Sequence, residues 1–364
     1  MDCISTHDLS YGAFSERLHA RVGQNRLPLN GSLEVTARCN MRCEHCYLPF
    51  AQRFGSQQNE LAFSEIQRIF SEIADAGCLW LLLTGGEPFL REDFMAIYDD
   101  AKRKGFIITI FTNGTLITEQ VADHLAEWIP FLIEISLYGA TQATYDRVTG
   151  VAGSFYRCMR SIEMLLERGL PLKLKSVLIT LNQHEILKMQ QLAESLGVDF
   201  RFDAVINAGL DGSLYPTRFR LSPEQIIAIE KQDPYRAQKW PEYFEKHKGV
   251  EINTLRMYTC GAGKSAFHVD STGHLCLCLS ARNPCYDLRK GSFLEGWETF
   301  IPGVLALEYD QEFSCVSCKL RAVCSQCPAM GFTELGDSEV RVPFLCKLAH
   351  LRHEAFSFDI PVSN

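Results

Sequence analysis

Short apolar runs alternate with amphipathic stretches from residue 31 to about residue 210. The apolar runs are brief and rich in branched side chains, which is typical of buried strands. The stretches between them place their apolar residues on one face of a helix. We therefore predict strands at residues 33–37, 79–84, 107–112, 132–137, 172–179 and 200–205. The helices predicted between them cover residues 64–76, 93–104, 119–128, 154–168 and 184–196.

Residues that start and stop helices agree with this alternation. Ser64 and Ser154 stand where two of the helices should begin, as N-caps do. Glycines end four of the predicted helices, at Gly77, Gly105, Gly169 and Gly197. Strand and helix in strict alternation predict repeated βα units around a parallel sheet, either an open doubly wound sheet or an incomplete barrel.

In either architecture, functional residues lie in the loops that follow the carboxyl ends of the strands. Glycine-bearing or polar segments occupy five of these loops: 39–46, 85–88, 112–114, 136–139 and 180–182. We expect these segments to converge on one rim of the sheet.

The first of these loops carries Cys39, Cys43 and Cys46 in the run CNMRCEHC. This spacing can supply thiolates to three irons of a cubane 4Fe-4S cluster and leave the fourth iron without a protein ligand. A structural zinc site would need a fourth ligand in a closed tetrahedron, and His45 lies where strain limits its joining the cysteines. The loop therefore favours an iron-sulfur cluster over zinc.

Composition limits the class of protein. The chain has 364 residues, 46% of them hydrophobic, and can bury a full-sized core with one smaller module. Its net charge of -8 provides no basic surface for nucleic acid, which we do not expect as a partner. The sequence shows neither a long apolar stretch nor the start of a signal peptide, so we expect a cytoplasmic protein that does not enter a membrane.

The fifteen cysteines are unevenly placed, and in a reducing cytosol they indicate metal or redox chemistry. Eight of them lie in the C-terminal part, at Cys260, Cys276, Cys278, Cys315, Cys318, Cys324, Cys327 and Cys346. We expect Cys3, Cys78, Cys158 and Cys285 to be ordinary buried or surface thiols. The predicted organisation is an N-terminal extension (1–30), a barrel (31–212), a helical bridge (213–258) and a cysteine-rich domain (259–364).

Three motifs in register, CNMRCEHC, GGEP at 85–88 and TNGT at 112–115, together resemble the radical S-adenosylmethionine (SAM) superfamily. The resemblance implies an α/β fold, a partial (β/α)6 TIM-like barrel open along one side. It also implies that Cys39, Cys43 and Cys46 bind a 4Fe-4S cluster whose fourth iron is chelated by SAM. One electron then cleaves SAM to methionine and a 5'-deoxyadenosyl radical, which abstracts an unactivated hydrogen.

The same resemblance suggests further contacts with SAM. Gly85 and Gly86 let the backbone approach the ligand, and Glu87 can accept from the methionine ammonium. Asn113 and Ser136 are placed for the ribose or carboxylate, and Arg147 can pair with the carboxylate. His45 and Tyr47 are expected to flank the adenine.

The C-terminal cysteines resemble the SPASM extension of radical SAM peptide maturases, which holds two auxiliary 4Fe-4S clusters. By this resemblance Cys315, Cys318, Cys324 and Cys346 bind the outer cluster, and Cys260, Cys278 and Cys327 the inner one. No cysteine lies about six residues before Cys260, so either Cys276 is the fourth inner ligand or one iron is open. Leu279 stands where sulfatase-maturing relatives carry an acidic residue, which disfavours that activity. A zinc ribbon is the competing interpretation of the paired cysteines.

These features predict a radical SAM/SPASM enzyme that modifies a ribosomally synthesised peptide by cross-linking, epimerisation or excision. We expect a flavodoxin or ferredoxin as reductant, and peptide recognition either by direct contact or through a separate protein. The alternative substrate is a small molecule: a sugar, a tetrapyrrole or a cofactor precursor. A third interpretation is a zinc-bound scaffold that binds peptides without catalysis.

Overall fold

The computed structural model describes residues 11–22, 25–55, 59–250, 252 and 254–357. The first ten residues of the predicted N-terminal extension, Cys3 among them, therefore lie outside the described part. The described strands form a single sheet in the order β6-β5-β4-β3-β2-β1-β7-β8-β9. Their bounds are β1 Asn30–Thr36, β2 Trp80–Gly85, β3 Ile107–Thr112, β4 Leu132–Ser136, β5 Leu172–Val177, β6 Asp199–Asp203, β7 Ala266–Val269, β8 His274–Cys276 and β9 Tyr286–Asp287.

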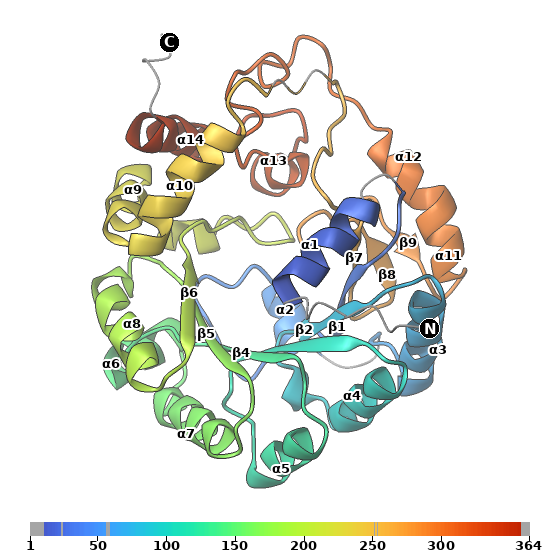
Figure 1. Cartoon of the computed structure of the whole chain (residues 1–364), viewed down its shortest axis with the longest axis vertical. Coiled ribbons are helices and arrows are strands. Elements are labelled where there is room, and N and C mark those ends of the chain that lie inside the picture. Colours follow the sequence, from blue (N-terminus) through green and yellow to red (C-terminus); the bar gives the residue numbers. More distant parts are fainter. Residues whose placement is uncertain (1–10, 23–24, 56–58, 251, 253, 358–364) are drawn as a thin grey trace, which may run out of the picture.

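Strands β1 to β6 are parallel neighbours, as the alternating pattern predicted. In the described part of the chain β6 ends the sheet on one side and β9 on the other, so the barrel stays open. Helices lie outside the curved sheet (Figure 1). The α/β partial-barrel prediction is confirmed. These helices are α3 Phe63–Asp75, α4 Phe94–Arg103, α5 Glu119–Glu127, α6 Gln142–Thr149, α7 Ser154–Glu167 and α8 Ile186–Ser195.

Amphipathic spacing explains how each helix packs. In α3 the apolar positions Ile66, Ile69, Phe70 and Ile73 are all buried, and each contributes about 1.5–3 kcal/mol by leaving water. The helix is followed by Gly77, whose φ of 94° suits a residue without a Cβ. The glycine stop signals were therefore correct.

The predicted N-caps at Ser64 and Ser154 were wrong. Helix α7 begins at Ser154 itself, and its N-cap is Gly153, whose φ is 72°. Helix α3 begins at Phe63, and its N-cap is Ala62. Ala62 has no side-chain acceptor, but the Glu65 carboxylate accepts from the Ala62 N–H at 2.7 Å. Glu65 therefore supplies the cap interaction from inside the helix, as the glutamate of a capping box does.

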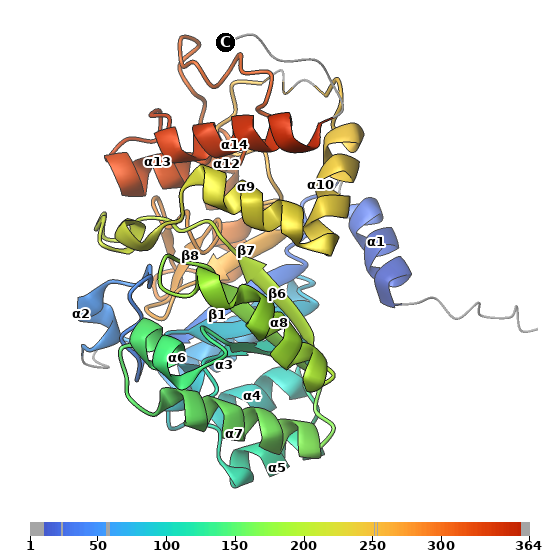
Figure 2. The same ribbon diagram turned by 90° about the vertical axis from the view of Figure 1, so that its left-hand side faces the viewer.

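The cysteine-rich segment adds strands to the barrel sheet. Strand β7 pairs in parallel with β1, and β8 and β9 continue the sheet as an antiparallel meander. Helices of the bridge and the C-terminal segment gather at one end of the molecule (Figure 2). They are α9 Pro223–Gln232, α10 Pro234–Lys246, α13 Pro328–Leu335 and α14 Pro343–Phe356, while α11 Phe293–Glu295 and α12 Ile301–Leu305 lie near β8 and β9.

The amino ends of the strands are covered by α1 (Tyr11–Val22). Tyr11 lies 4.8 Å from the Phe131 ring that precedes β4, and His19 stacks on Trp80 at the start of β2 at 5.3 Å. The helix therefore covers the end of the sheet opposite to the predicted functional loops.

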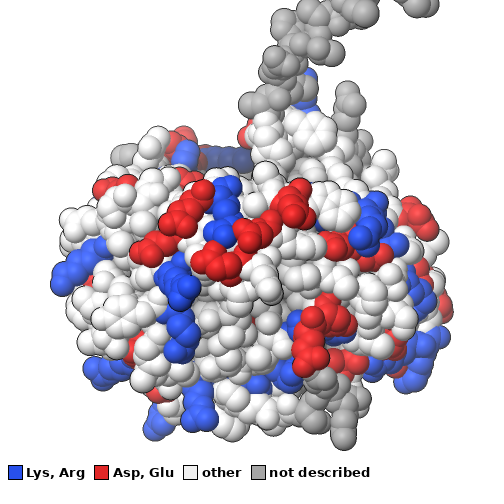
Figure 3. All heavy atoms as spheres, turned by 90° about the horizontal axis from the view of Figure 1, so that it is seen from below, with Lys and Arg blue, Asp and Glu red and all other residues white. Residues whose placement is uncertain are grey.

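The charged side chains are mixed on the face seen from below, where basic and acidic groups lie next to one another (Figure 3). Pairing of this kind is found for Arg168, which follows α7 and binds both Asp123 and Glu119 of α5. This face therefore presents no extended basic surface. Within the described part of the chain, no helix combines the length and apolar character needed to cross a membrane.

Candidate functional site

The cysteine loop between β1 and α2 (Phe50–Arg53) is held by backbone hydrogen bonds from two sides. The Cys39 N–H donates to the Arg53 carbonyl at 3.0 Å. The Arg42 N–H donates to Thr149 at 2.8 Å, and the Glu44 N–H to Val148 at 3.2 Å. The end of α6 therefore fixes the middle of the loop.

The three thiols of this loop are close enough to act on one another. Burial raises the pKa of Cys39 to about 12, and nearby Cys46 adds to the shift. Burial also raises the pKa of Cys43, again with contributions from the other two cysteines. Three partly buried thiols that lie near one another fit a metal centre, because a bound cation offsets the cost of desolvating thiolates.

The sulfur of Cys39 also accepts hydrogen bonds of the kind that tune iron-sulfur thiolates. The Met41 N–H donates to it at 3.4 Å, and the Asn113 amide nitrogen lies 3.9 Å away. Among the described residues, no three His, Cys, Asp or Glu side chains are grouped to hold a single ion. A four-iron cluster binds each thiolate to a different iron, so its ligands are spread more widely than those of one ion.

The Gly85-Gly86 pair allows two backbone segments to touch. A Cβ on Gly85, whose φ is 142°, would lie 2.1 Å from the Thr36 carbonyl oxygen, and one on Gly86 would lie 2.2 Å from that of Arg38. In their absence the Gly86 N–H donates to Thr36 at 2.9 Å and the Glu87 N–H to Arg38 at 2.8 Å. The glycines thus join the GGEP segment to the entry of the cysteine loop.

Glu87 is fully buried between the ends of β2 and β3. Its carboxylate accepts from the Thr112 hydroxyl at 2.7 Å, the Asn113 N–H at 2.7 Å and the Phe89 N–H at 3.2 Å. Burial raises its pKa to about 7 although these hydrogen bonds act in the opposite direction. Glu87, which was predicted to accept from the SAM ammonium, therefore links the GGEP and TNGT motifs through hydrogen bonds.

Asn113 makes the next connection. Its amide nitrogen donates to the Asn40 side chain at 2.8 Å, and its amide oxygen accepts from Thr115 N–H at 2.9 Å. Asn40 in turn donates to the Thr115 hydroxyl at 2.9 Å. The cysteine loop, GGEP and TNGT therefore form one hydrogen-bonded unit, and the predicted convergence of these three segments is found.

His45 and Tyr47 line a cavity of about 140 Å³ with apolar residues at the ends of β5 and β6 and with residues of the cysteine-rich segment. The His45 ring meets Tyr138 edge-on at 4.8 Å, and burial lowers the His45 pKa to about 4. Within the described part of the chain, no hydrogen-bond partner reaches His45 Nδ1 or the Asn207 amide oxygen beside the same cavity. The cavity combines apolar walls with free polar atoms, as a purine site would.

Two other predicted SAM contacts take less defined positions. Ser136 ends β4, and its carbonyl accepts from the Tyr145 hydroxyl at 3.1 Å. Arg147 is exposed on α6, one residue before the segment that holds the cysteine loop. Both lie on the same edge as the cysteines, and their predicted roles remain predictions.

The C-terminal cysteines form two groups. Cys315, Cys318, Cys324 and Cys346 line one cavity of about 140 Å³, with Arg321 and Arg341 on its wall. Cys327 instead lies near Cys278 and Cys260, and all three act on the nearby Tyr258. The two groups are those that the resemblance assigned to the outer and inner clusters.

Cys276 faces away from the inner group. Its thiol interacts with Cys285, which raises the pKa of Cys276 and, together with the nearby His274, lowers that of Cys285 to about 6. Cys276 also donates to the His274 carbonyl at 3.5 Å. Its predicted role as the fourth inner ligand therefore remains a prediction that the side-chain contacts do not favour.

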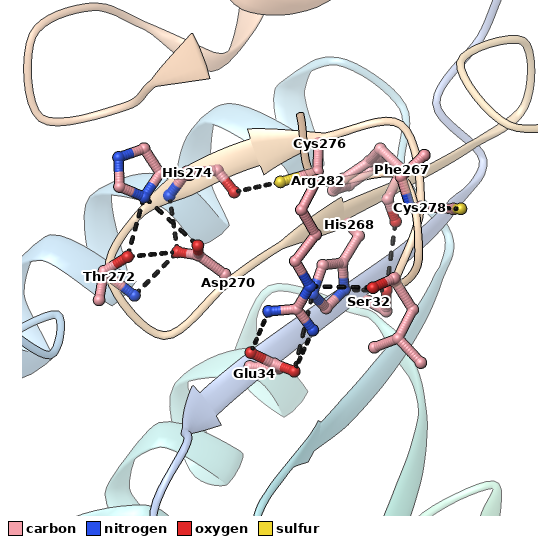
Figure 4. Close-up of polar contacts among 12 residues, drawn as sticks. Ser32, Glu34, Phe267, His268, Asp270, Thr272, His274, Cys276, Cys278 and Arg282 are labelled. Carbon is pink, nitrogen blue, oxygen red and sulfur yellow. Dashed lines mark hydrogen bonds and ion pairs between the residues drawn. The ribbon is translucent and has the colours of Figure 1, made fainter. Parts of the chain in front are cut away.

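Sequence reasoning missed the roles of several residues around the site. Tyr138 lies in the predicted functional loop 136–139, but the spacing of residues along the sequence could not predict its contact with the His45 ring. Glu34 stands at an inward position of β1 and accepts two hydrogen bonds from Arg282, one of them at 2.9 Å (Figure 4). A glutamate inside a strand was the one available signal, and its partner lies 248 residues away.

Comparison with known proteins identifies the central domain. Residues 33–193 match the family model of the radical SAM superfamily. These residues form a radical SAM domain. The prediction made from the three motifs is confirmed, and the protein is an enzyme of the radical SAM type.

Two curated relatives and one solved structure resemble the chain over most of its length. The AdoMet-dependent heme synthase of Methanosarcina barkeri is 26% identical over 85% of this chain and 94% of its own. The PqqA peptide cyclase of Bradyrhizobium diazoefficiens is 28% identical over 71% and 68%. Streptococcus suis SuiB bound to precursor peptide SuiA superposes with a TM-score of 0.70 at 18% identity, over 95% of this chain and 84% of SuiB. The fold around the radical SAM domain, cysteine-rich segment included, is thus shared with SuiB.

Proposed function

We propose that this radical SAM enzyme modifies a ribosomally synthesised peptide by hydrogen abstraction and uses three 4Fe-4S clusters. The observation that carries the proposal is the division of the cysteines into three separate groups, one beside the radical SAM motifs and two in the extension. The chain supplies ten cysteines to these groups: Cys39, Cys43, Cys46, Cys260, Cys278, Cys315, Cys318, Cys324, Cys327 and Cys346.

In the proposed site, the residues of the first loop would hold the SAM-binding cluster and the walls around it would hold SAM. When bound, the cluster and SAM supply a 5'-deoxyadenosyl radical that abstracts hydrogen from an unactivated carbon. His45 and Tyr47 would flank the adenine in their cavity. The methionine part of SAM would lie against a compact backbone edge formed by Gly85, Gly86 and Glu87. Its polar contacts would come from Asn113, Ser136 and Arg147.

The buried surroundings of these residues serve the chemistry. Tyr145 and Val148 are buried and Tyr138 is partly buried around the cysteine loop, where they shield its inner face from water. Exclusion of water prevents a reactive carbon radical from being quenched before it meets the substrate. The extension would place the inner group of cysteines beside the same cavity, since Leu279 follows Cys278 and lines it.

A peptide substrate is supported by two of the similar proteins. One relative is named a PqqA peptide cyclase, and SuiB shares the fold in a structure with its precursor peptide bound. We propose the same substrate class here, with a flavodoxin or ferredoxin as electron donor and recognition either direct or through a separate protein. The auxiliary clusters would conduct electrons or anchor the peptide.

A tetrapyrrole is the second candidate substrate. Its support is the relative named AdoMet-dependent heme synthase, which is similar over 94% of its length. The peptide remains the leading proposal, because the fold that the chain shares with SuiB was solved there with a precursor peptide bound.

Anaerobic reconstitution and turnover test the proposal. Brown protein with about three clusters should lose one cluster on replacing Cys39, Cys43 and Cys46 together by Ala, and with it SAM cleavage. Colourless protein that holds zinc would overturn the proposal. With SAM and reductant, a peptide encoded beside the gene should lose two hydrogens or exchange deuterium, whereas turnover of a tetrapyrrole alone would support the second candidate.

A further inference from the structure

Cys276 and Cys285 lie opposite each other across two antiparallel strands. The ladder between β8 and β9 pairs His274 with Asp287 and Leu275 with Tyr286. One step further along this register places Cys276 against Cys285, and their thiols are in contact. Opposed residues of an antiparallel pair have Cβ atoms about 4.5–5.5 Å apart, whereas a disulfide needs about 3.5–4.5 Å. A small movement therefore brings the two sulfurs to bonding distance.

The two cysteines differ in access. Cys285 is exposed, whereas Cys276 is fully buried with its thiol directed at the His274 carbonyl. The hairpin turn before β8 is fixed, because Asp270 accepts from Thr272 and from the His274 N–H at 2.9 Å (Figure 4). A small reagent can therefore reach Cys285 first. The buried Cys276 thiol is then positioned to react with the modified Cys285.

The chain between these cysteines carries several parts of the proposed site. Cys278 belongs to the inner group, and Leu279 and Ser280 line the cavity beside His45. Arg282 reaches into the barrel and binds Glu34 of β1 (Figure 4). A bond between Cys276 and Cys285 would close the base of this loop.

We propose that Cys276 and Cys285 form a reversible cross-strand disulfide, a modification site separate from the cluster cysteines, which fixes the loop 277–284. The oxidant is a low-molecular-weight disulfide such as oxidised glutathione. Cys285 attacks it, forms a mixed disulfide and releases one small thiol, and Cys276 then attacks the Cys285 sulfur and releases the second. Two protein thiols are oxidised, the small disulfide is reduced to two thiols, and these carry away the two protons.

The test uses the reconstituted holoenzyme under anaerobic conditions, treated with oxidised glutathione and mapped by mass spectrometry after alkylation. We expect a peptide pair joined through Cys276 and Cys285, a loss of two hydrogens, and slower amide hydrogen exchange in residues 277–284. Reduction of the disulfide should restore the two lost hydrogens and the original rate of amide hydrogen exchange. The bond should form whether or not a peptide substrate is turned over, so its result is separate from that of the proposed function.

Single substitutions test the order of reaction. Cys276→Ser should leave the mixed disulfide trapped on Cys285, whereas Cys285→Ser should leave Cys276 unmodified. Cys78→Ser, which removes a buried thiol next to Gly31 of β1, should still form the bond. Two reduced cysteines after treatment would overturn the proposal. Loss of iron or altered cluster spectra in Cys276→Ser would also overturn it, because Cys276 would then be a cluster ligand.

Discussion

At the scale of single residues, the Glu87 side chain stabilises the structure of the site and is also a proposed contact of SAM. Its carboxylate is buried and joins the ends of β2 and β3 through three donors. A carboxylate that is so well supplied with donors is fixed in position before a ligand arrives. Any contact with a SAM ammonium would use the acceptor capacity that these donors leave.

Replacing Glu87 by Gln should therefore lower the stability of the protein itself. The amide puts an NH₂ group against donors from Thr112 and Asn113, and we expect a loss of about 1–3 kcal/mol in the free energy of unfolding. Urea unfolding of cluster-free protein measures it. Glu92→Gln, at an exposed neighbour, is the control and should change little. An equally stable Glu87→Gln protein would show that the three hydrogen bonds contribute nothing.

Gly86 should be nearly intolerant of a methyl group. In Gly86→Ala the Cβ would meet the Arg38 and Ala37 carbonyl oxygens at 2.2 and 2.4 Å, so the GGEP segment must move away from the cysteine loop. We expect about 1–3 kcal/mol of lost stability and weaker retention of the N-terminal cluster, followed by denaturant unfolding and iron content. Gly303→Ala meets nothing within 4 Å and serves as the matched control. Similar values for both variants would contradict the argument.

At the scale of elements, Glu185 ties the start of α8 to the loop after β4. It is buried, and its carboxylate accepts from the Ala140 N–H at 2.8 Å and from the Thr141 N–H and hydroxyl at 3.2 and 2.6 Å. Burial alone would raise the pKa of Glu185, but the hydrogen bonds outweigh burial and lower it from 4.5. The loop that leads into α6, and so to the cysteine loop, depends on this acceptor.

The stabilisation from Glu185 should be lost in acid. Because its folded-state pKa lies below the unfolded value, the stabilisation is fully present above pH 4.5 and disappears as the pH falls through the folded-state pKa. Glu185→Gln cannot titrate, so it should be less stable than the wild type by about 1–3 kcal/mol at pH 7, with a difference that shrinks in acid. Unfolding of cluster-free protein across pH measures this, with exposed Glu194→Gln as control. A difference independent of pH would refute it.

The sequence allowed the repeated elements to be predicted and left the exceptional ones unseen. Strands β1 to β6 and five helices follow from apolar spacing, because each buries one face against the same sheet. Helix α6 was missed since its eight residues are short and polar, and β7 to β9 were missed since strands of two to four residues carry little periodicity. In the site, adjacent motifs such as GGEP and TNGT could be placed by topology. The contact between Cys276 and Cys285 could not, because it depends on the register of a hairpin that spacing does not define.

At the scale of the whole molecule, the barrel and the cysteine-rich extension share one sheet. Two of the ion pairs that join them in the described part of the chain differ in character. Arg282 binds Glu34 of β1, whose side chain is 1% exposed. Arg289 binds Glu65 of α3, and those side chains are 34% and 31% exposed. Both pairs connect the same two parts of the chain, which makes burial the main difference between them.

The burial of each ion pair should determine how much its loss lowers the free energy of unfolding. Arg282→Met removes the cation from the buried Glu34 carboxylate and should cost about 3–5 kcal/mol, because burial lowers the pKa of the neighbouring His268, 3.9 Å away, and keeps it from replacing the charge. Arg289→Met breaks a hydrated pair and should cost less than about 1 kcal/mol. Replacing both members of the buried pair, as Glu34→Leu with Arg282→Met, should recover most of the loss, because no isolated charge remains. Denaturant unfolding of the four proteins in this cycle gives the coupling energy. Equal losses from the two arginine variants would mean that burial adds nothing to the pair and that Arg282 contributes no more than a surface contact.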